Sequence, residues 1–321
     1  MMRIPMHRQR GTAIITALLV VLLATSIAAF LLVQQSRALT RTARATERAQ
    51  AILFARPMLQ WARAALFEFQ KNNQSVDLTQ RWAQPIAAAP IEGALASGFF
   101  RDEAGRFNVN SIVNDDGKRN DADIAIFKRL LENLALSPEL SNALVDWIDR
   151  DDETSFPGGA EDSAYLALAQ PFRAANQRIV QIEELYSVKG FDIATINKLK
   201  PFITALPAQT KININTAPEE VLAAVLPTLG KAAMGELLSR RMARPFKSTD
   251  GEDGIQTYFK NVPAETGVSI LSVNSGYFSV ALGVSTGGTM VRQSALFQSV
   301  LSNTAPPKSI AWPRIIWIKD D

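Results

Sequence analysis

Residues 12–33, TAIITALLVVLLATSIAAFLLV, form 22 consecutive positions without a charged side chain. As an α-helix this stretch would be about 33 Å long, which matches the roughly 30 Å hydrocarbon core of a bilayer. The preceding residues 1–11, MMRIPMHRQRG, carry three arginines and no acid, a bias typical of a cytoplasmic flank. No small-residue cleavage site follows in QQSRALTRTARA, so the apolar helix should be retained. The sequence therefore predicts a single-pass anchor in a lipid bilayer, with a cytoplasmic N-terminus and the bulk of the chain exported.

The helical pattern continues beyond this span. Apolar residues recur at three- and four-residue steps over about 25 further positions, which indicates a helix with one buried face. They are Ile52, Ala55, Leu59, Ala62, Leu66 and Phe69. Pro57 falls inside the pattern and should kink or split the helix, because proline cannot donate the backbone hydrogen bond. We predict a transmembrane and amphipathic helix over residues 12–70 with an interruption near Pro57.

The composition excludes several kinds of catalytic site. The 321 residues (35.1 kDa) contain no cysteine and a single histidine, His7, within the first eleven positions. If those positions are removed, the chain cannot build a Ser-His-Asp triad, a thiol nucleophile or a Cys/His zinc site. The same removal leaves 31 basic against 31 acidic residues, so bulk charge gives no support for nucleic-acid binding. Carboxylate-based catalysis and oxygen-binding metals such as Ca²⁺ or Mg²⁺ remain open on these counts, and we expect no nucleic-acid partner.

The leader and the long helix together resemble those of type IV pilin-like proteins, with an ordinary signal anchor as the alternative. The leader ends in Gly11, before the apolar run, which resembles a prepilin-peptidase site. The resemblance implies cleavage after Gly11 and methylation of the new N-terminal amine of Thr12. Pilin-like subunits normally carry Glu at the fifth mature position, where this chain has Thr16. A carboxylate in hydrocarbon needs a partner, so its absence suggests a subunit with no neighbour on that side. This departure resembles the K-type minor pseudopilins of bacterial type II secretion systems.

Membership of that family would set the fold. The implied class is α+β and type IV pilin-like, with a long N-terminal helix, a small antiparallel sheet and a large all-α inserted domain. The implied divisions are a leader (1–11), the long helix (12–70), an α/β head (71–113 and 265–305), the inserted helical domain (114–264) and an extended C-terminal tail (306–321). The inserted domain would contain two SAM-like subdomains, about 114–206 and 211–264.

The resemblance also implies a function and a set of partners. Such a protein sits in the bacterial inner membrane with its head in the periplasm. It joins the I- and J-type minor pseudopilins, caps the tip of the pseudopilus and helps to initiate its assembly. Since this is an assembly role, we expect no catalytic residues. Further implied partners are the H-type and major pseudopilins, the prepilin peptidase and the inner-membrane secretion platform.

Two regions outside the long helix have the character of β-structure. Phe278, Val280, Leu282 and Val284 alternate with small or polar residues, which predicts a strand, and Gly287-Gly288 predict a hairpin turn into a second strand over residues 290–301. The stretch 99–113, FFRDEAGRFNVNSIV, indicates a strand or a short hairpin with Gly105 at its turn. Between these regions the patterns are mostly helical, including a helix over 121–136.

Two short stretches in the helical region resemble each other. Residues 107–111 read FNVNS and residues 212–216 read ININT. The simplest interpretation is two strand-to-helix junctions whose asparagines satisfy turns. A capping-box pattern begins at Thr216 in the second copy. That copy, with Arg240, Arg241 and Arg244 downstream, also resembles a helix-hairpin-helix module, although its hairpin has one glycine in place of two. A membrane-anchored DNA-uptake protein is therefore an alternative function.

Residues 146–162, DWIDRDDETSFPGGAED, contain seven acids and one base. Two of the acids, Asp146 and Asp149, share one face of a helix end, where negative charge opposes the helix dipole. The Pro-Gly-Gly turn lets the last two acids fold back towards the first, and a loop rich in carboxylate oxygens suits Ca²⁺ better than Mg²⁺. We predict a structural calcium site here, as the resemblance also implies. The expected ligands are Asp149, Asp151, Glu161 and Asp162, with Asp146, Asp152 and Glu153 as further candidates.

Two other interpretations of this segment remain open at the level of sequence. It can be a solvated acidic loop, or a pair of its carboxylates can serve a membrane-anchored hydrolase. A second acid-rich stretch, residues 114–123 (NDDGKRNDAD), resembles a calcium loop only superficially. It lacks the glutamate that closes an EF-hand loop, and a turn followed by a helix N-terminus explains it.

Overall fold

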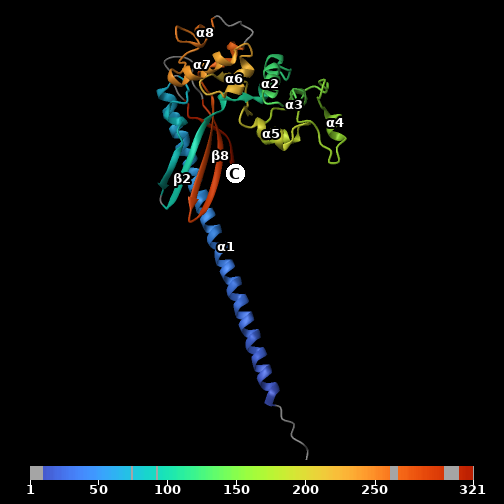
Figure 1. Cartoon of the computed structure of the whole chain (residues 1–321), viewed down its shortest axis with the longest axis vertical. Helices are drawn as coiled ribbons and strands as arrows, with labels where there is room; N and C mark the ends of the chain where they lie inside the picture. The colour runs from blue at the N-terminus through green and yellow to red at the C-terminus, as the bar shows by residue number, and fades with distance from the viewer. Residues whose placement is uncertain (1–9, 74, 92, 261–266, 300–310, 321) are drawn as a thin grey trace, which may run out of the picture.

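The computed structural model describes residues 10–73, 75–91, 93–260, 267–299 and 311–320. Its longest element is α1 (Arg10–Asn72), a 63-residue helix whose first part projects from a folded head as a bare stalk (Figure 1). Within the described residues, α1 is the one helix long and apolar enough to span a membrane. The helix runs unbroken through Pro57, so the predicted split is wrong. Buried residues on either side of the proline, such as Ala55 and Met58, pack against the head and hold the helix together.

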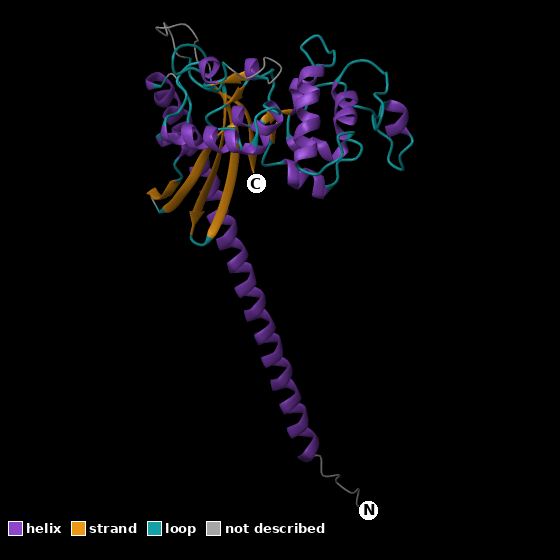
Figure 2. Ribbon diagram, turned by 45° about the horizontal axis from the view of Figure 1, so that its top comes forward, coloured by secondary structure: helices purple, strands orange, loops and turns teal. Residues whose placement is uncertain are grey.

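The second part of α1 packs across a five-stranded antiparallel sheet with the strand order β1-β2-β7-β8-β9 (Figure 2). The strands are β1 (Ile86–Ile91), β2 (Ala94–Asp102), β7 (Tyr277–Thr286), β8 (Thr289–Gln298) and β9 (Arg314–Asp320). The buried stripe of α1 is Ala51, Ala55, Met58, Leu59, Ala62 and Leu66. The sheet meets this stripe with Phe278, Val280, Leu282 and Val284 of β7, as their alternation predicts. Helix and sheet thus enclose the apolar core of a pilin-like head.

The hairpin between β7 and β8 turns at Gly287 and Gly288, as predicted. Their φ angles of 55° and 100° lie in the region that glycine adopts most easily. The turn rests on α1 at Glu47. The Oε2 atom of Glu47 accepts a hydrogen bond of 2.7 Å from Thr289 Oγ1, and its backbone carbonyl accepts one of 2.9 Å from Thr286 Oγ1. The folded head therefore begins at Glu47 along the stalk.

The C-terminal tail is extended, as expected, and it is also part of the sheet. Strand β9 pairs antiparallel with β8, so the end of the chain forms one edge of the head. Gln293 Nε2 of β8 donates to Asp320 Oδ1 at 2.8 Å. Lys319 Nζ of β9 lies 2.8 Å from the Glu183 carboxylate, which belongs to the inserted region. The tail therefore connects the sheet to the insertion.

The insertion leaves the sheet after β2 and returns to it at β7. Asp102 at the end of β2 is paired with Phe278 near the start of β7, so the insertion projects from one end of the sheet. In Figures 1 and 2 this end lies away from the stalk. The elements of its first part are β3 (Phe107–Asn108), α2 (Asp121–Asn133), α3 (Leu140–Ile148), α4 (Asp162–Leu166), α5 (Ile193–Leu199) and β4 (Ile203–Thr204). Those of its second part are β5 (Ile212–Asn213), α6 (Glu219–Val225), α7 (Lys231–Ala243), α8 (Ile255–Tyr258) and β6 (Leu271–Ser272).

Each part of the insertion is closed by a short parallel strand pair. β3 pairs with β4 in the first part, and β5 pairs with β6 in the second. The stretch 99–113 therefore contains the end of β2 and, further on, β3, which do not form a hairpin with each other. After Asp102 a 3₁₀ turn over Glu103–Gly105 leads to β3, which finds its partner about 95 residues downstream. The predicted helix 121–136 is observed as α2, three residues shorter at its C-terminus.

One continuous apolar core fills both parts of the insertion. Helices α2 and α6 lie side by side, and the Arg129 Nε of α2 donates a 2.6 Å hydrogen bond to the Ala224 carbonyl of α6. Phe107 and Phe127 stack within the first part, with ring centroids 5.4 Å apart. The two parts are therefore packed on each other and do not behave as beads on a flexible linker.

Candidate functional site: a carboxylate cluster and a polar joint

Three of the predicted ligands converge at the outer end of the first part of the insertion. Asp146 lies on α3, Asp149 directly follows that helix, and Glu161 directly precedes α4. All three are buried, with 0%, 4% and 3% of their surface exposed. Such burial is costly for carboxylates without compensating partners, so the set needs an explanation beyond solvation. This observation argues against the interpretation as a solvated loop.

The loop between α3 and α4 closes tightly around Asp146. Both carboxylate oxygens of Asp146 accept from the Ser155 backbone N–H, at 3.2 and 3.0 Å. A side chain at Gly159 would collide with Asp146 Oδ2 and the Ser155 carbonyl, so only glycine allows the chain to pass this close. The Pro-Gly-Gly turn therefore folds the chain back as the sequence predicts.

The other four predicted ligands are not held in the same way. Asp162 faces another segment, where its oxygens accept from Arg173 Nη1 and the Ala174 N–H, both at 2.9 Å. Asp151 accepts from the Glu153 N–H at 3.0 Å, and the side chains of Asp151, Asp152 and Glu153 are exposed. The structure thus brings Asp146, Asp149 and Glu161 together, leaves three acids at the solvent side and engages Asp162 elsewhere.

Buried oxygens without partners mark the centre of this cluster. Asp149 Oδ1 and both carboxylate oxygens of Glu161 are buried and have no hydrogen-bond partner in the described part of the chain. Burial, followed by repulsion from Asp151 and Asp146, raises the pKa of Asp149 to about 7. Burial, followed by repulsion from Asp146 and Asp149, raises the pKa of Glu161 to about 8. A divalent cation would relieve both effects, so the donor set fits a hard, oxygen-binding ion.

The cluster does not form a complete ligand shell by itself. No three acidic or histidine side chains in the described ranges stand in an arrangement that could already hold an ion. Ca²⁺ takes six to eight oxygens, and backbone carbonyls or water would have to supply the remainder. Asp146, Asp149 and Glu161 are the residues that would hold such an ion, and its role there would be to tie α3 to α4.

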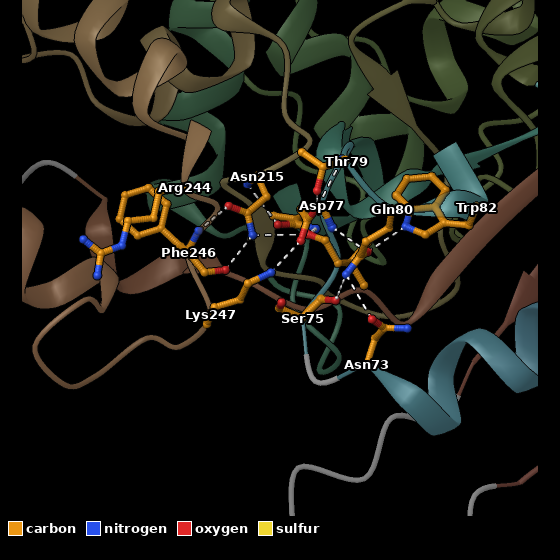
Figure 3. Close-up of polar contacts among 12 residues, drawn as sticks. Asn73, Ser75, Asp77, Thr79, Gln80, Trp82, Asn215, Arg244, Phe246 and Lys247 are labelled. Carbon is orange, nitrogen blue, oxygen red and sulfur yellow. Dashed lines mark hydrogen bonds and ion pairs between the residues drawn. The ribbon is translucent and has the colours of Figure 1, made fainter. Parts of the chain in front are cut away.

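A second polar site joins the head to the second part of the insertion (Figure 3). The segment that follows α1 places Asp77 in a nearly buried position, with 1% of its side chain exposed. Its Oδ1 accepts from Thr79, and its Oδ2 lies 2.9 Å from Lys247 Nζ. The Gln80 side chain accepts from the Asp77 N–H and from Trp82 Nε1, both at 2.9 Å. These hydrogen bonds fold the segment into a compact turn, with Asp77 facing Lys247.

The second asparagine turn belongs to the same joint. Asn215 accepts from the Phe246 N–H at 2.9 Å and donates to the carbonyls of Phe246 and Val76, at 2.9 and 3.2 Å (Figure 3). Asn213 donates to the Val76 carbonyl at 3.0 Å and to Asp102 Oδ2 at 2.8 Å. We call residues 75–80, 102, 213–216 and 246–247 the polar joint. It fastens the second part of the insertion to the segment after α1 and to the end of β2.

Thr216 does not cap a helix as the sequence predicts. Its hydroxyl donates to Asp102 Oδ2 at 2.7 Å, and α6 begins after Pro218 without a side-chain cap. Asp102 is fully enclosed, and this burial raises its pKa although several donors surround it. The hydroxyl is therefore used by the joint, because a buried carboxylate is a stronger acceptor than water-exposed backbone.

The arginines that suggested a DNA-binding module have partners within the protein. Arg241 donates to the carbonyls of Ile214 and Ala217 at 2.8 and 2.6 Å. The Arg240 guanidinium lies 3.9 Å from the centre of the Phe246 ring, a cation–π contact. Arg244 forms a 2.5 Å ion pair with an exposed aspartate of the following loop. These contacts stabilise α7 and the joint, and they give no support to a nucleic-acid surface.

The predicted processing residues lie at the start of α1. Gly11 and Thr12 fall in its first turn, and residues 1–9 of the leader lie outside the described residues. Thr16 Oγ1 donates to the carbonyls of Thr12 and Ala13, both at 3.0 Å. The Thr16 hydroxyl is thus satisfied by its own helix and needs no partner from another chain.

Comparison with known proteins places this architecture in a family. Models of a family described as Type II secretion system (T2SS), protein K match residues 105–208 and 212–280. Type II secretion system protein K of Pectobacterium carotovorum is 32% identical over 307 residues, which cover 90% of this chain and 92% of that protein. The chain belongs to the type II secretion system protein K family. The resemblance to K-type minor pseudopilins is therefore confirmed.

Other relatives agree with this assignment. Protein K of Pseudomonas aeruginosa is 31% identical over 87% of this chain and 85% of its own length. A chain in the crystal structure of the GspK-GspI-GspJ complex from enterotoxigenic Escherichia coli is 25% identical, with a TM-score of 0.71. That match covers 88% of this chain and 99% of the other. It confirms the mixed α+β fold with a long N-terminal helix, an antiparallel sheet and additional helices.

Sequence reasoning found the carboxylate cluster but missed the polar joint. Asp77 and Lys247 are separated by 170 positions, and neither belongs to a recognisable motif. The ININT stretch was the one available signal, because its asparagines repeat those of FNVNS. The repeat did not indicate which segment the asparagines of ININT would bind by hydrogen bonds.

Proposed function

We propose that this protein is the minor pseudopilin of K type that caps the tip of a periplasmic pseudopilus and helps to initiate its assembly. The observation that carries the proposal is the match of 88% of the chain to a protein solved in complex with GspI and GspJ. By analogy the I- and J-type minor pseudopilins are its direct partners. H-type and major pseudopilins would occupy the pseudopilus beneath this tip complex. The role is structural: it orders an assembly and catalyses no reaction.

The position of the insertion supports placement at a tip. It projects from the end of the sheet opposite the stalk, where a subunit stacked above would have to sit (Figure 1). Thr16 supports the same conclusion, because a buried glutamate costs about 2.5–3.5 kcal/mol in a membrane and is useful only where a partner charge exists. A subunit without a neighbour above it has no use for that carboxylate.

The proposed location is the inner membrane, with residues 12–33 spanning the bilayer and the head in the periplasm. The prepilin peptidase would cleave after Gly11 and methylate Thr12, and the secretion platform would receive the mature subunit. The exposed apolar surface of the stalk supports an anchor, since every residue from 12 to 33 is exposed on the isolated chain. The mass of the mature N-terminus, with and without the peptidase, tests the processing. An intact N-terminus in both samples would contradict it.

We also propose that Ca²⁺ occupies the cluster of Asp146, Asp149 and Glu161. The support is the set of buried carboxylate oxygens that lack donors. In this position the ion would hold α3 and α4 together and keep the outer end of the insertion rigid. The proposal is independent of the tip role, because a pseudopilin without the ion could still assemble.

The assembly proposal is tested by co-expressing the full chain with the I- and J-type subunits of the same secretion system and purifying through a tag on the I-type subunit. A complex containing all three supports the proposal. Labelled protein should then appear only at fibre ends in electron micrographs. Recovery of the I- and J-type pair without this chain, or labelling along the fibre length, would overturn the proposal. A Thr16→Glu variant sharpens the test, because we expect it to insert less well and not to gain lateral positions.

A further inference from the structure

The bare part of α1 between the apolar span and the head carries a row of four exposed arginines, Arg37, Arg41, Arg44 and Arg48. Steps of four, three and four residues place them within about 60° of one another around the helix. No acidic residue precedes Glu47 in the chain. In the described residues, no carboxylate lies within 4 Å of these four guanidinium groups. We call these four residues the basic stripe.

The basic stripe continues the face of α1 that forms the core of the head. Counting 100° per residue, Arg48 is followed on the same face by Ala51, Ala55 and Leu59, which are buried against the sheet. The change from arginine to apolar residues coincides with Glu47, where the β7–β8 turn meets the helix. The basic stripe therefore lies on the side of the stalk beneath the head, outside the reach of the carboxylates of the head.

Its distance from the apolar span identifies what it can touch. Arg37 and Arg41 lie four and eight residues beyond Val33, or about 6 and 12 Å along the axis. The headgroup layer extends about 5–8 Å beyond the hydrocarbon on each side. Side chains of a helix lean towards its N-terminus, which here is the direction of the bilayer, and arginine can extend its charged end further. Both guanidinium groups therefore reach lipid phosphates, and Arg44 lies within a Debye length of about 8–10 Å.

We propose that the basic stripe, through Arg37, Arg41 and Arg44, binds the headgroups of anionic phospholipids in the leaflet on the same side as the head, with Arg48 too far along the helix to take part. Guanidinium groups pair with phosphate oxygens through two parallel hydrogen bonds, which favours phosphate over a neutral surface. The contact sets how deeply α1 sits in the bilayer and holds the head at a fixed height above it. This inference rests on the proposed membrane anchor.

The experiment uses the full chain reconstituted into vesicles with equal amounts of phosphatidylglycerol and phosphatidylcholine. The protein is extracted in mild detergent, and the lipids that remain bound are counted by native mass spectrometry. Wild type should retain phosphatidylglycerol over phosphatidylcholine. The variant with Arg37, Arg41, Arg44 and Arg48 all changed to Gln should lose this preference by about fivefold or more, since even one basic residue near an anionic surface contributes about 1 kcal/mol, which corresponds to a factor of about five.

A matched variant controls for net charge. It replaces four exposed lysines of the insertion, outside the basic stripe, with Gln: Lys198, Lys211, Lys231 and Lys260. It should keep the wild-type lipid preference, and 0.5 M NaCl should lower that preference in both proteins. Equal retention of the two lipids by wild type would overturn the proposal and leave an acidic protein surface as the partner of the stripe. An unchanged preference in the Arg→Gln variant would also overturn it.

The anchor is checked separately by flotation of the vesicles. A chain that fails to float with vesicles of either composition contradicts the membrane anchor itself, whereas a chain that floats without lipid preference contradicts only the basic stripe. Circular dichroism and thermal unfolding should be the same for wild type and the Arg→Gln variant, because the four arginines are exposed and form no ion pair with the described residues of the head.

Discussion

The two parts of the insertion begin with the same asparagine turn and use it for different purposes. In residues 107–111, Asn108 accepts from the N–H groups of Asn110 and Leu206, at 3.2 and 3.0 Å. Asn110 accepts from the Ile179 N–H at 2.9 Å and donates to the Ile179 carbonyl at 2.8 Å. In the second part, Asn213 and Asn215 occupy the equivalent positions, but the segments they hold include Val76 of the head.

This difference shows how a duplicated local structure can acquire two roles. The first turn closes its own subdomain, because the segments it binds all lie within residues 105–208. The second turn binds both a loop of its own part, at Phe246, and the segment that follows α1, at Val76. Only the first part, among the described residues, also carries a cluster of buried carboxylates without partners. The asparagine turn of the first part thus serves its own subdomain, which also holds the proposed calcium loop, and that of the second part serves the attachment to the head.

The largest effect should come from replacing the second asparagine of each turn. Asn110→Leu leaves three buried backbone hydrogen-bonding groups without partners. Asn215→Leu leaves two, because the Val76 carbonyl keeps its hydrogen bond from Asn213. At about 1–3 kcal/mol per group, Asn110→Leu should lose about 3 kcal/mol or more of unfolding free energy and Asn215→Leu about 2 kcal/mol or more. Hydrogen exchange separates the roles: Asn110→Leu should deprotect residues 176–208, and Asn215→Leu should deprotect residues 75–80. Identical exchange patterns in the two variants would refute the division of roles.

Calcium should stabilise the first part alone. At a free concentration of about a hundred times its dissociation constant, a ligand that binds only the native state contributes about 2.7 kcal/mol. Chelation should therefore lower the unfolding temperature and increase exchange in residues 149–165 but not in residues 219–243. The double variant Asp149→Asn with Glu161→Gln should abolish the response. The matched double variant Asp250→Asn with Glu252→Gln, in the second part, should keep the response to chelation. A response that survives in Asp149→Asn with Glu161→Gln would exclude the calcium site.

The pH dependence of the ion-free protein sharpens this contrast. Burial and mutual repulsion raise the pKa of Asp149 and Glu161 to about 7 and about 8, so the native state binds their protons more tightly than the unfolded state. Stability from these groups is therefore present at low pH and is lost as pH rises to about 8. Calcium favours the ionised form and should flatten this loss. Scanning calorimetry between pH 5 and pH 8, with chelator or with calcium, measures the effect.

A smaller effect should follow from Lys247→Met. The substitution removes the cation opposite Asp77, a carboxylate that is almost fully buried. The lysine itself is 63% exposed, so solvent screens much of the pair and we expect a loss of about 1 kcal/mol. Exchange should increase in residues 75–80 while residues 176–208 stay protected. Lys260→Met, at an exposed lysine of the same part, is the control and should change neither.

The smallest effect should come from Lys319→Met. This change breaks the ion pair between β9 and Glu183, in which both side chains are partly exposed. The expected loss is below about 1 kcal/mol. The place where hydrogen exchange changes is informative. Exchange should increase near residues 182–187 and stay the same in the polar joint. A change confined to the joint would mean that the first part is attached through the second part and not through the tail.

The sequence was sufficient wherever a periodic pattern lies along one element. The apolar steps of α1 and the alternation of Phe278, Val280 and Leu282 predict their elements because each residue packs on one known face. The FNVNS and ININT turns were also interpreted correctly as junctions. In the candidate site, the Pro-Gly-Gly turn predicted the return of Glu161 towards Asp149, because a turn brings nearby acids together.

Pairings between distant segments were beyond such patterns. The capping-box prediction at Thr216 failed because Asp102, which is 114 positions away, takes the hydroxyl. Lys247 lies beside Asp77 only because the whole insertion folds between them. The spacing of residues along the sequence gives no sign of this contact. The predicted ligand Asp162 was drawn to Arg173, a competitor that the acid-rich pattern did not reveal. The convergence of acids in this loop was therefore predicted as a region, and the positions of the individual side chains were predicted only in part.

The position of the polar joint has a consequence for the order in which the chain folds. A ribosome completes β2 some 175 residues before it makes β7, so the β2 edge waits without its neighbour while the insertion is synthesised. Asn213 and Thr216 bind Asp102 at the end of β2, and they emerge about 60 residues ahead of β7. We expect the joint to form first and to hold the returning chain at the end of β2. Pairing of β7 with β2 then closes a loop of about 60 residues in place of one of about 175. Interdomain contacts that hold the mature protein together thereby also guide the nascent sheet to its correct partner.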